Sequence, residues 1–326
     1  MNKIYTRVDY AYRDLVEHVL EHGVLKENRT GVDTISDFSY SYKLDLSDSF
    51  PLIQSKLINP RAIIAENLWF LSGEENIKML QDFGFKFWNA WADDEGRVES
   101  AYGRFWRHYP MPQINQDVDF EDPVGGKIKM TSTGEAWAMP DYEADVHDDH
   151  SNPFVHRHGP GLAFDQIGWL ANELRHNPNS RRLILNAWHP ANATVSRLPP
   201  CHMTAVFNVQ ANRLNCHLLQ RSADIALGVP FNIAGYAFIT ELLARESGLS
   251  VGTFGHTMVD AHIYVNHIDE LRNQIDRMRP VSNLSSLGHQ VKLVIEPGVS
   301  MFDLKMDDIK VEEYYPMGVS NYEVAV

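Results

Sequence analysis

The chain has 326 residues and a formal net charge of −14 at pH 7. Its apolar content of 44% is enough for a large core, so we expect one globular domain spanning residues 1–326. The negative charge argues against binding to long nucleic acids, which depends on many cationic contacts to phosphate. Binding of one phosphate stays possible, because a few arginines in a pocket suffice for it.

The N-terminal segment, the apolar runs and the cysteines of the chain predict its cellular compartment. No charged-then-apolar leader opens the sequence, and no apolar run approaches the roughly 20 residues that cross a bilayer. Cys201 and Cys216 are too few to form a disulfide framework in a chain of this length. We therefore expect a cytoplasmic protein with reduced thiols.

The first hundred residues predict two helices. Apolar residues at three-to-four spacing within 11–25 predict a helix that ends near Gly23. The run 62–71 contains a single charge, Glu66, which predicts a buried helix that closes before Gly73. A carboxylate in such surroundings must be paired, protonated or functional, and we favour a functional role for Glu66.

Residues 108–162 break these patterns. They are dense in Pro, Gly, Asp and His, and no helical or strand period persists, which predicts a surface insertion. The acidic and histidine-rich run 145–150, followed by His156 and His158, raises a metal site as an alternative. We expect no metal there, because structural zinc sites have ordered Cys/His spacing and loops of this composition are usually solvated.

The second half of the chain predicts a hairpin followed by a helix. Side chains alternate over 203–209 and 214–218 with Ala211-Asn212 between them, which indicates two strands joined by a tight turn. Cys216 falls on the apolar face of the second strand, so we interpret it as a core residue. Apolar spacing over 231–247 predicts a helix after Pro230, with Asn232 at its start.

Two segments carry the chemistry. Leu-Pro-Pro-Cys-His at 198–202 offers a thiol, and the stretch 220–236, which reads QRSADIALGVPFNIAGY, offers a cation, hydroxyls and an amide. A thiol attacks as the thiolate, and its pKa near 8.5 falls beside a guanidinium, for which Arg221 is the candidate. Neighbouring strand residues face opposite ways, so His202 is badly placed to be the base for Cys201. Cys201 is our candidate nucleophile, with a packed core cysteine as the alternative.

Together these segments closely resemble the thymidylate synthase family, and the resemblance covers about 29–107 and from 165 to the C-terminus. Members of that family transfer a one-carbon unit from 5,10-methylenetetrahydrofolate to C5 of dUMP. The resemblance implies an α+β fold with a large curved mixed β-sheet flanked by helices. It also implies a homodimer in which the two sheets pack back to back.

The resemblance assigns the catalytic roles. Cys201 adds to C6 of the pyrimidine, Glu66 organises proton transfer around O4, and Tyr102 serves removal of the C5 proton. Arg221 activates the thiol and binds the phosphate. Asn232 selects uracil, because an amide donates to O4 and accepts from N3–H in one bidentate contact. A helix cap is the alternative role for Asn232.

The remaining ligands also follow from the resemblance. Nucleotide contacts are expected from Arg29, Gln220, Ser222, Asp224, His262 and Tyr264, and from Arg181 and Arg182 of the other subunit. Folate contacts are expected from Lys56, Trp88, Trp91, Asp224, Gly228, Phe231 and Val326. The alternatives are solvated surface arginines, a core His-Tyr pair and structural packing of the aromatic residues.

Two reaction outcomes share nearly all of these residues. Hydride addition to the methylene intermediate gives dTMP, and water addition gives 5-hydroxymethyl-dUMP. The polar residues Glu99 and Ser100, where relatives often have Gly-Pro, favour water, whereas Trp88 and the apolar tail 322–326 favour a dry cavity and hydride. We predict the hydride outcome, with dUMP hydroxymethylase as the alternative. A catalytically silent nucleotide- or RNA-binding protein is the third reading, disfavoured by the intact Cys201, Glu66 and Tyr102.

Overall fold

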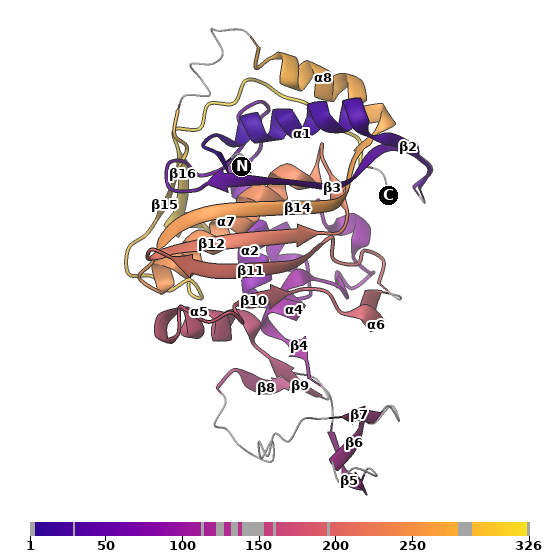
Figure 1. Ribbon diagram of the computed structural model, residues 1–326, viewed down its shortest axis with the longest axis vertical. Helices are drawn as coiled ribbons and strands as arrows, with labels where there is room; N and C mark the ends of the chain where they lie inside the picture. The colour runs from indigo at the N-terminus through magenta and orange to yellow at the C-terminus, as the bar shows by residue number, and fades with distance from the viewer. Residues whose placement is uncertain are drawn as a thin grey trace.

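The computed structural model describes residues 4–28, 30–111, 114–121, 127–131, 136–138, 153–158, 161–193, 196–279 and 289–324. Within these ranges the largest sheet has eight strands (Figure 1). Its main path runs β1 (Ile4–Tyr5), β3 (Thr34–Asp45), β14 (Ser250–Tyr264), β12 (Arg213–Gln220), β11 (His202–Gln210) and β10 (Ile184–Asn186). Two further strands join it: β2 (Val24–Lys26) pairs with β3, and β13 (Ala223–Asp224) pairs with β14.

The sheet is mixed. β3 with β14, β12 with β11, β11 with β10 and β2 with β3 are antiparallel, whereas β1 with β3, β12 with β14 and β13 with β14 are parallel. The strands lie in front of two long helices in Figure 1, α2 (Pro60–Ser72) and α7 (Gly228–Glu246). The predicted α+β class with a large mixed sheet flanked by helices is therefore confirmed.

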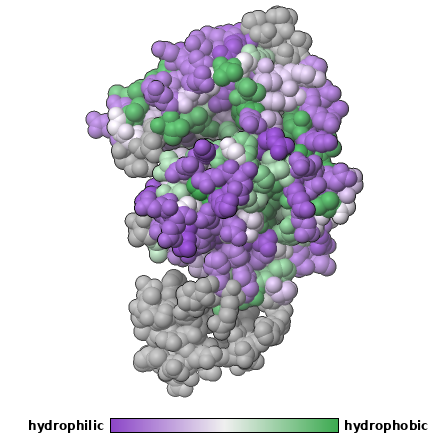
Figure 2. Space-filling model, turned by 180° about the vertical axis from the view of Figure 1, so that it is seen from behind, coloured by the Kyte–Doolittle hydropathy of each residue, from purple (hydrophilic) through white to green (hydrophobic). Residues whose placement is uncertain are grey.

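Other helices cover the ends of the sheet. In Figure 1, α1 (Val8–His22) lies along the β3 edge with α8 (Ile268–Asp276) beyond it, and α4 (Tyr102–Arg107) and α5 (Gln166–His176) lie near β10. The shorter elements are α3 (Lys78–Asp82), η1 (Asn89–Trp91), α6 (Pro190–Ala193), η2 (Val265–His267), β15 (Lys292–Ile295), η3 (Met306–Asp308) and β16 (Ile309–Glu312). The side facing away in Figure 1 is largely hydrophilic, with hydrophobic areas between (Figure 2). No helix among the described residues combines the length and apolar character needed to cross a membrane.

The buried helix predicted over 62–71 is confirmed as α2. Pro60 occupies its first position, the Asn59 side chain accepts from the backbone N–H of Arg61, and Gly73 closes it at φ 79°. Each signal matches what a helix end requires: a proline needs no N–H there, an amide oxygen satisfies an orphan donor, and glycine adopts the left-handed conformation freely. These caps fix both ends of α2, and Glu66 lies between them in the middle of the helix.

Two predicted helices begin earlier than the sequence indicated. The first helix starts at Val8 and ends at His22, and Leu25 belongs to β2. Helix α7 starts at Gly228, so Pro230 lies inside its first turn, where backbone N–H groups have no helical partner and a proline costs little. Asn232 therefore lies at the start of the second turn, and its alternative role as a helix cap is wrong.

The predicted hairpin is confirmed as β11 and β12. Ala211 and Asn212 connect the strands at φ 49° and 60°, the positive values that a two-residue type I′ turn requires. Cys216 on β12 is 2% exposed, in agreement with its interpretation as a core residue.

Residues 108–162 contain more regular structure than their composition indicated. β4 (Tyr109–Pro110), β9 (Gly161–Phe164) and β8 (Val155–His158) form one small sheet, and β5 (Ile114–Glu121), β6 (Lys127–Thr131) and β7 (Ala136–Ala138) form another. Most of these strands are too short to leave a period in the sequence. Figure 1 places both sheets below α5, apart from the large sheet.

The candidate metal cluster falls partly outside the described residues, which do not include 145–150. His156 is described, and its Nε2 lies 2.7 Å from Nδ1 of His108. The ring of His158 stacks on the ring of His108 with their centroids 4.1 Å apart, and His158 Nε2 lies 3.7 Å from Glu75 Oε1. In the part of the chain that the structure describes, no three histidine, cysteine or carboxylate side chains are arranged to hold a metal ion.

Candidate active site

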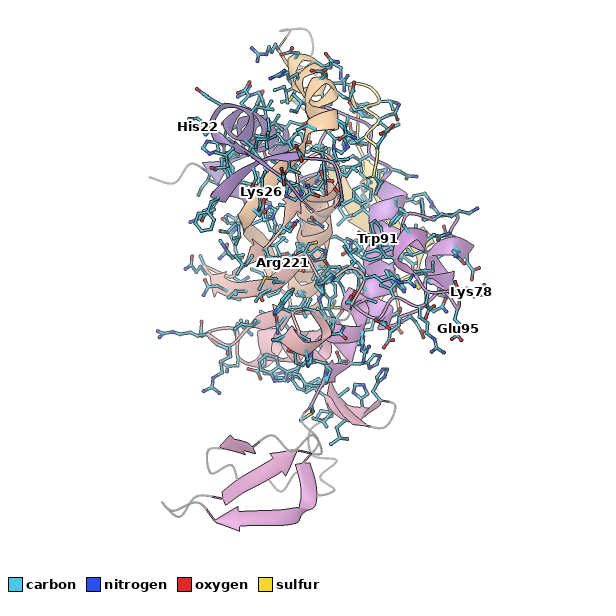
Figure 3. The ribbon with its side chains drawn as sticks, turned by 90° about the vertical axis from the view of Figure 1, so that its right-hand side faces the viewer. His22, Lys26, Lys78, Trp91, Glu95 and Arg221 are labelled. Atoms are coloured by element: carbon cyan, nitrogen blue, oxygen red, sulfur yellow. The ribbon has the colours of Figure 1, made fainter. Side chains whose placement is uncertain are left out.

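A cavity of about 770 Å³ opens where β12 and β14 end and α7 begins. Figure 3 shows Arg221 near the centre of the molecule, with Lys26 above it and Trp91 to the right. Most of the predicted site residues line this cavity: Glu66, Trp88, Trp91, Tyr102, Cys201, Gln220, Arg221, Ser222, Asp224, Gly228, Phe231, Asn232, His262 and Tyr264. Residues as far apart in the sequence as Glu66 and Tyr264 thus line one cavity.

The thiol and its cation come from the ends of one hairpin. His202 opposes Gln220 in the β11–β12 register, so Cys201 and Arg221 lie just beyond the paired region. The backbone N–H of Arg221 donates to the carbonyl of Cys201 at 2.9 Å, and its Nη2 lies 3.8 Å from Cys201 Sγ. A guanidinium at this position stabilises the thiolate form of a cysteine.

The guanidinium is held by the same peptide that carries the thiol. Arg221 Nε donates to the carbonyl of Pro200 at 3.0 Å and Nη2 donates to the carbonyl of Pro199 at 2.7 Å. Trp188 covers the guanidinium, with its ring centre 5.2 Å away. The Pro-Pro-Cys segment and Arg221 therefore form one locked unit.

His202 is turned away from chemistry at the thiol. Its ring stacks on Tyr102 at 3.6 Å with an interplanar angle of 3°, and Nδ1 lies 2.9 Å from the Tyr236 hydroxyl. Burial, with a contribution from nearby His256, lowers the pKa of His202 to about 3, so the ring is neutral. This placement agrees with the expectation that His202 does not act as the base for Cys201.

Tyr102 is hydrogen-bonded to the backbone of Cys201. It begins α4 and is 4% exposed, and its hydroxyl accepts from the backbone N–H of Cys201 at 2.8 Å. Burial raises the pKa of Tyr102 well above its ordinary value, so its hydroxyl keeps its proton. The side chain thereby fixes the backbone at Cys201 and presents a neutral hydroxyl to the cavity.

Glu66 reaches the cavity from the middle of α2. Its Oε1 accepts from Trp88 Nε1 at 2.8 Å. Desolvation raises the pKa of Glu66 to about 7, against the opposing effect of the Trp88 hydrogen bond. A carboxyl with such a pKa exchanges a proton readily near neutral pH.

The amide of Asn232 is oriented by Gln220. Gln220 Nε2 donates to Asn232 Oδ1 at 2.9 Å and to the carbonyl of Ser222 at 3.0 Å. Gln220 is 2% exposed, so these bonds are made out of contact with bulk water. Since the oxygen of Asn232 faces Gln220, its Nδ2 is the end that can donate to a ligand.

Phe87, Trp88, Trp91 and Phe231 form an aromatic wall of the cavity. Trp88 and Trp91 lie 5.6 Å apart at 68°, and Phe87 and Phe231 lie 6.1 Å apart. At Gly228 an added Cβ would meet only ordinary van der Waals contacts, so internal packing does not demand glycine there. The wall suits a flat heteroaromatic ring that approaches the start of α7 closely.

The structure also brings in residues that the sequence analysis missed. Asp260 lines the cavity and pairs with Lys26, and its Oδ1 accepts from the Ser36 hydroxyl at 2.6 Å. Hydrogen bonds from His262, Lys26 and Ser36 hold the pKa of Asp260 well below its usual range. The signal available was its position two residues before His262, which puts both on one face of β14.

Several predicted residues do not reach the cavity wall. Lys56 is 5% exposed, donates to the carbonyl of Ala226 at 2.6 Å and lies over the Tyr322 ring at 4.7 Å, and burial lowers its pKa to about 8. Arg181 and Arg182 are exposed between α5 and β10 and are not among the lining residues. Arg29 and Val326 lie outside the described residues, although Val324 lines the cavity rim.

The Cys201–Arg221 pair and the Glu66 carboxyl, whose pKa is about 7, share one cavity at the end of the mixed sheet, an arrangement typical of covalent catalysis by a thiol. The family model for thymidylate synthase matches residues 10–326. The chain therefore belongs to the thymidylate synthase family, a family of one-carbon transferases. It is similar to the thymidylate synthase of Haloferax volcanii, with 46% identity over 275 residues that cover 80% of this chain and 72% of that protein.

Proposed function

We propose that the protein transfers a one-carbon unit from 5,10-methylenetetrahydrofolate to C5 of dUMP and releases dTMP and dihydrofolate. The observation that carries this proposal is the convergence of Cys201, Arg221 and Asn232 on one cavity, with Arg221 Nη2 3.8 Å from the thiol. The three side chains supply a nucleophile, a cation for thiolate and phosphate, and an amide for a pyrimidine edge.

Cys201 adds to C6 of the uracil ring, so a S–C6 bond forms and electron density moves to C5 and O4. Asn232 donates to O4 as this charge develops, and Glu66, with its pKa near 7, exchanges a proton there. After C5 has gained the carbon and lost its proton, the S–C6 bond breaks and restores the thiolate beside Arg221.

Tyr102 is proposed to serve the loss of the C5 proton. Because its pKa lies well above the ordinary value, the hydroxyl stays protonated and orients an acceptor instead of taking the proton as a phenolate. When bound, 5,10-methylenetetrahydrofolate supplies both the carbon and the hydride. Trp88, Trp91, Phe231 and Gly228 are proposed to hold it, because they offer an aromatic wall and open space beside α7.

The cavity lining supports hydride transfer over water addition. Ser100, one of the polar residues that favoured water, donates its hydroxyl to the carbonyl of Leu198 at 2.5 Å. Neither Ser100 nor Glu99 is among the cavity-lining residues. Neither side chain therefore adds a polar group to the cavity that could hold an extra water beside the aromatic wall.

A product assay tests the proposal. Purified protein is incubated with dUMP and 5,10-methylenetetrahydrofolate, and we expect the absorbance of dihydrofolate to rise in step with dTMP. A hydroxymethylated nucleotide formed without dihydrofolate would establish the dUMP hydroxymethylase reaction instead. The protein is also treated with 5-fluoro-dUMP and the folate, and mass spectrometry should find a covalent adduct on Cys201 that the Cys201→Ser variant lacks.

We further propose a homodimer formed through the open face of the sheet. Ile184 opposes Val206 and Val206 opposes His217, so all three share a face, and both aliphatic residues are 41% exposed. Arg181 and Arg182 are exposed next to β10 and are available to a neighbouring site. The proposed subunits bury this face against each other.

Subunit mixing tests the dimer and its shared site together. Cys201→Ser protein is inactive for lack of the thiol, and Arg181→Ala/Arg182→Ala protein for lack of the donated cations. Mixing them after mild unfolding and refolding should restore part of the activity, because one intact site forms in each mixed dimer. A monomer in sedimentation, or no recovery on mixing, contradicts the shared site.

A further inference from the structure

Hydrogen bonds connect the interior of the sheet to the base-reading amide. The Tyr42 hydroxyl lies 2.9 Å from His256 Nδ1, and His256 Nε2 lies 2.9 Å from Gln220 Oε1. Gln220 Nε2 in turn donates to Asn232 Oδ1 at 2.9 Å. Tyr42, His256 and Gln220 are 6%, 0% and 2% exposed. Bulk water does not reach these groups, so breaking any of these hydrogen bonds costs free energy.

Strand register explains why these four side chains meet. Tyr42 on β3 opposes His256 on β14, and His256 opposes Leu218 on β12, two residues before Gln220. Side chains two apart on a strand share a face, so Tyr42, His256 and Gln220 form a row across three strands. The row ends at Asn232 on α7.

A backbone carbonyl fixes the direction of every bond in the row. The carbonyl of Ser222 only accepts, so the group of Gln220 that lies 3.0 Å away must be its nitrogen. Both hydrogens of that nitrogen are then used, one on Ser222 and one on Asn232. The opposite end of Gln220 is an oxygen, and His256 Nε2 must carry the hydrogen that it accepts.

The remaining two groups follow. Burial, with His217 nearby, lowers the pKa of His256 to about 3, so the ring is neutral and has one hydrogen. Because that hydrogen is on Nε2, Nδ1 accepts and the Tyr42 hydroxyl donates. Burial also raises the pKa of Tyr42 well above its ordinary value, so the hydroxyl keeps the proton that it donates.

We propose that Tyr42 and His256 are positioning residues that hold the Asn232 amide in the orientation that binds uracil and rejects cytosine. This inference rests on the proposed function, in which Asn232 reads the base. Asn232 Oδ1 accepts from Gln220 and keeps one lone pair for N3–H of uracil, while Nδ2 donates to O4. Cytosine needs the reverse orientation, since it accepts at N3 and donates from its exocyclic amine.

Turning Asn232 to suit cytosine would place its Nδ2 against Gln220 Nε2, two donors in contact. Turning Gln220 as well would place its oxygen against the carbonyl of Ser222, two acceptors in contact. It would also require His256 to move its hydrogen to Nδ1 and Tyr42 to accept. The discrimination at Asn232 is therefore supported by each bond of the row.

Nucleotide affinities test the proposal. We would measure dissociation constants of dUMP and dCMP by calorimetry for the full-length protein and for Tyr42→Phe and His256→Phe. Each change removes a member of the row and retains an aromatic ring. We expect the preference for dUMP over dCMP to fall by about fivefold in Tyr42→Phe and by more in His256→Phe, in line with the loss of one or two buried hydrogen bonds.

Tyr12→Phe is the matched control. Tyr12 is 1% exposed, and its hydroxyl donates to the carbonyl of Ile225 at 2.9 Å, outside the row, so the preference should stay at the unmodified value. Thermal unfolding confirms that each variant is folded, and Tyr42→Phe keeps the test valid should His256→Phe fail to fold.

Three results overturn the inference, and they are distinguishable. In the first, the unmodified protein prefers dUMP and Asn232→Asp changes that preference, but both row variants retain it. The row then has no positioning role. A positioning role is likewise ruled out if the variants bind both nucleotides more weakly by the same factor. If the unmodified protein does not prefer dUMP, the proposed function fails, and this inference with it.

Discussion

The two cysteines of the β11–β12 hairpin show how position within one element sets the chemistry of a side chain. Cys216 lies inside β12, is 2% exposed, and burial raises its pKa to about 12. Cys201 lies just before β11, is partly exposed to the cavity, and has the Arg221 guanidinium 3.8 Å from its sulfur. Inside the sheet a thiol is an apolar packing group, whereas at the end of the strands it is available for attack.

The largest expected effect separates the two thiols by activity. Cys201→Ser should lower kcat by roughly 10⁴-fold or more, because a hydroxyl in this setting lacks both the nucleophilicity and the ionisation of the thiol. Steady-state assays with dUMP and the folate provide the measurement. Retention of even a tenth of the activity would mean that the sulfur at position 201 is not the nucleophile.

Arg221→Lys should sharpen the comparison by making Cys201 more like an ordinary thiol. A lysine ammonium is a compact point charge without the planar fork of a guanidinium, so it does not reproduce the two hydrogen bonds to Pro199 and Pro200 together with the contact to the sulfur, and we expect activity to fall about 100-fold. Alkylation of Cys201 by iodoacetamide at pH 7 should slow by about tenfold. The buried Cys216 serves as the internal reference, and unchanged alkylation at position 201 would contradict a role for Arg221 in activating the thiol.

Glu66→Gln tests the carboxyl that shares the cavity with Cys201. We expect kcat to fall about 100-fold and the limb of the pH–rate profile near pH 7 to disappear. The folded pKa of about 7 exceeds the ordinary value of 4.5, so the stability associated with the protonated carboxyl is lost as pH rises from about 4.5 through 7.

It follows that Glu66→Gln should be about as stable as the unmodified protein at pH 4 and more stable by about 3 kcal/mol at pH 8. Denaturant unfolding at both values measures this difference. A variant that loses stability equally at both values would show that the carboxyl is not strained by burial.

The smallest expected effect on activity belongs to Cys216→Ala. Loss of one buried sulfur should lower the free energy of unfolding by about 1 kcal/mol and leave kcat within about twofold. Chemical denaturation and the standard assay measure the two quantities. A large loss of kcat at unchanged stability would break the division between a packing thiol and a reacting thiol.

The sequence predicted the parts of the site that lie in short, contiguous segments. Cys201, Arg221 and Asn232 stand within two such segments, and Glu66 is conspicuous as a charge in an apolar helix. The cavity gathers all four. The mixed sheet and the β11–β12 turn were likewise predictable, because the fold resembles a known family and because alternation is a local signal.

Other features depend on tertiary contacts that no local pattern encodes. His256 alternates with its neighbours like any core strand residue, and its link to Gln220 forms only when β14 pairs with β12. Lys26 and Asp260 are 234 residues apart and meet through β3. The start of α7 at Gly228 is not evident from the sequence, because Pro230 resembles a boundary although a proline is tolerated throughout a first turn.

The clamp of Arg221 on the carbonyls of Pro199 and Pro200 has a consequence for protection of the enzyme against damage. The hydrogen bonds from Arg221 to Pro199 and Pro200 hold the guanidinium beside the sulfur of Cys201. A bound nucleotide is therefore not needed to bring the cation to the thiol. We therefore expect peroxide and small alkylating agents to reach the sulfur in the free protein, where Arg221 already lies 3.8 Å from it. Trp88, Trp91 and the tail residue Val324 line the same cavity as Cys201, so a nucleotide bound in that cavity would shield the sulfur from these reagents.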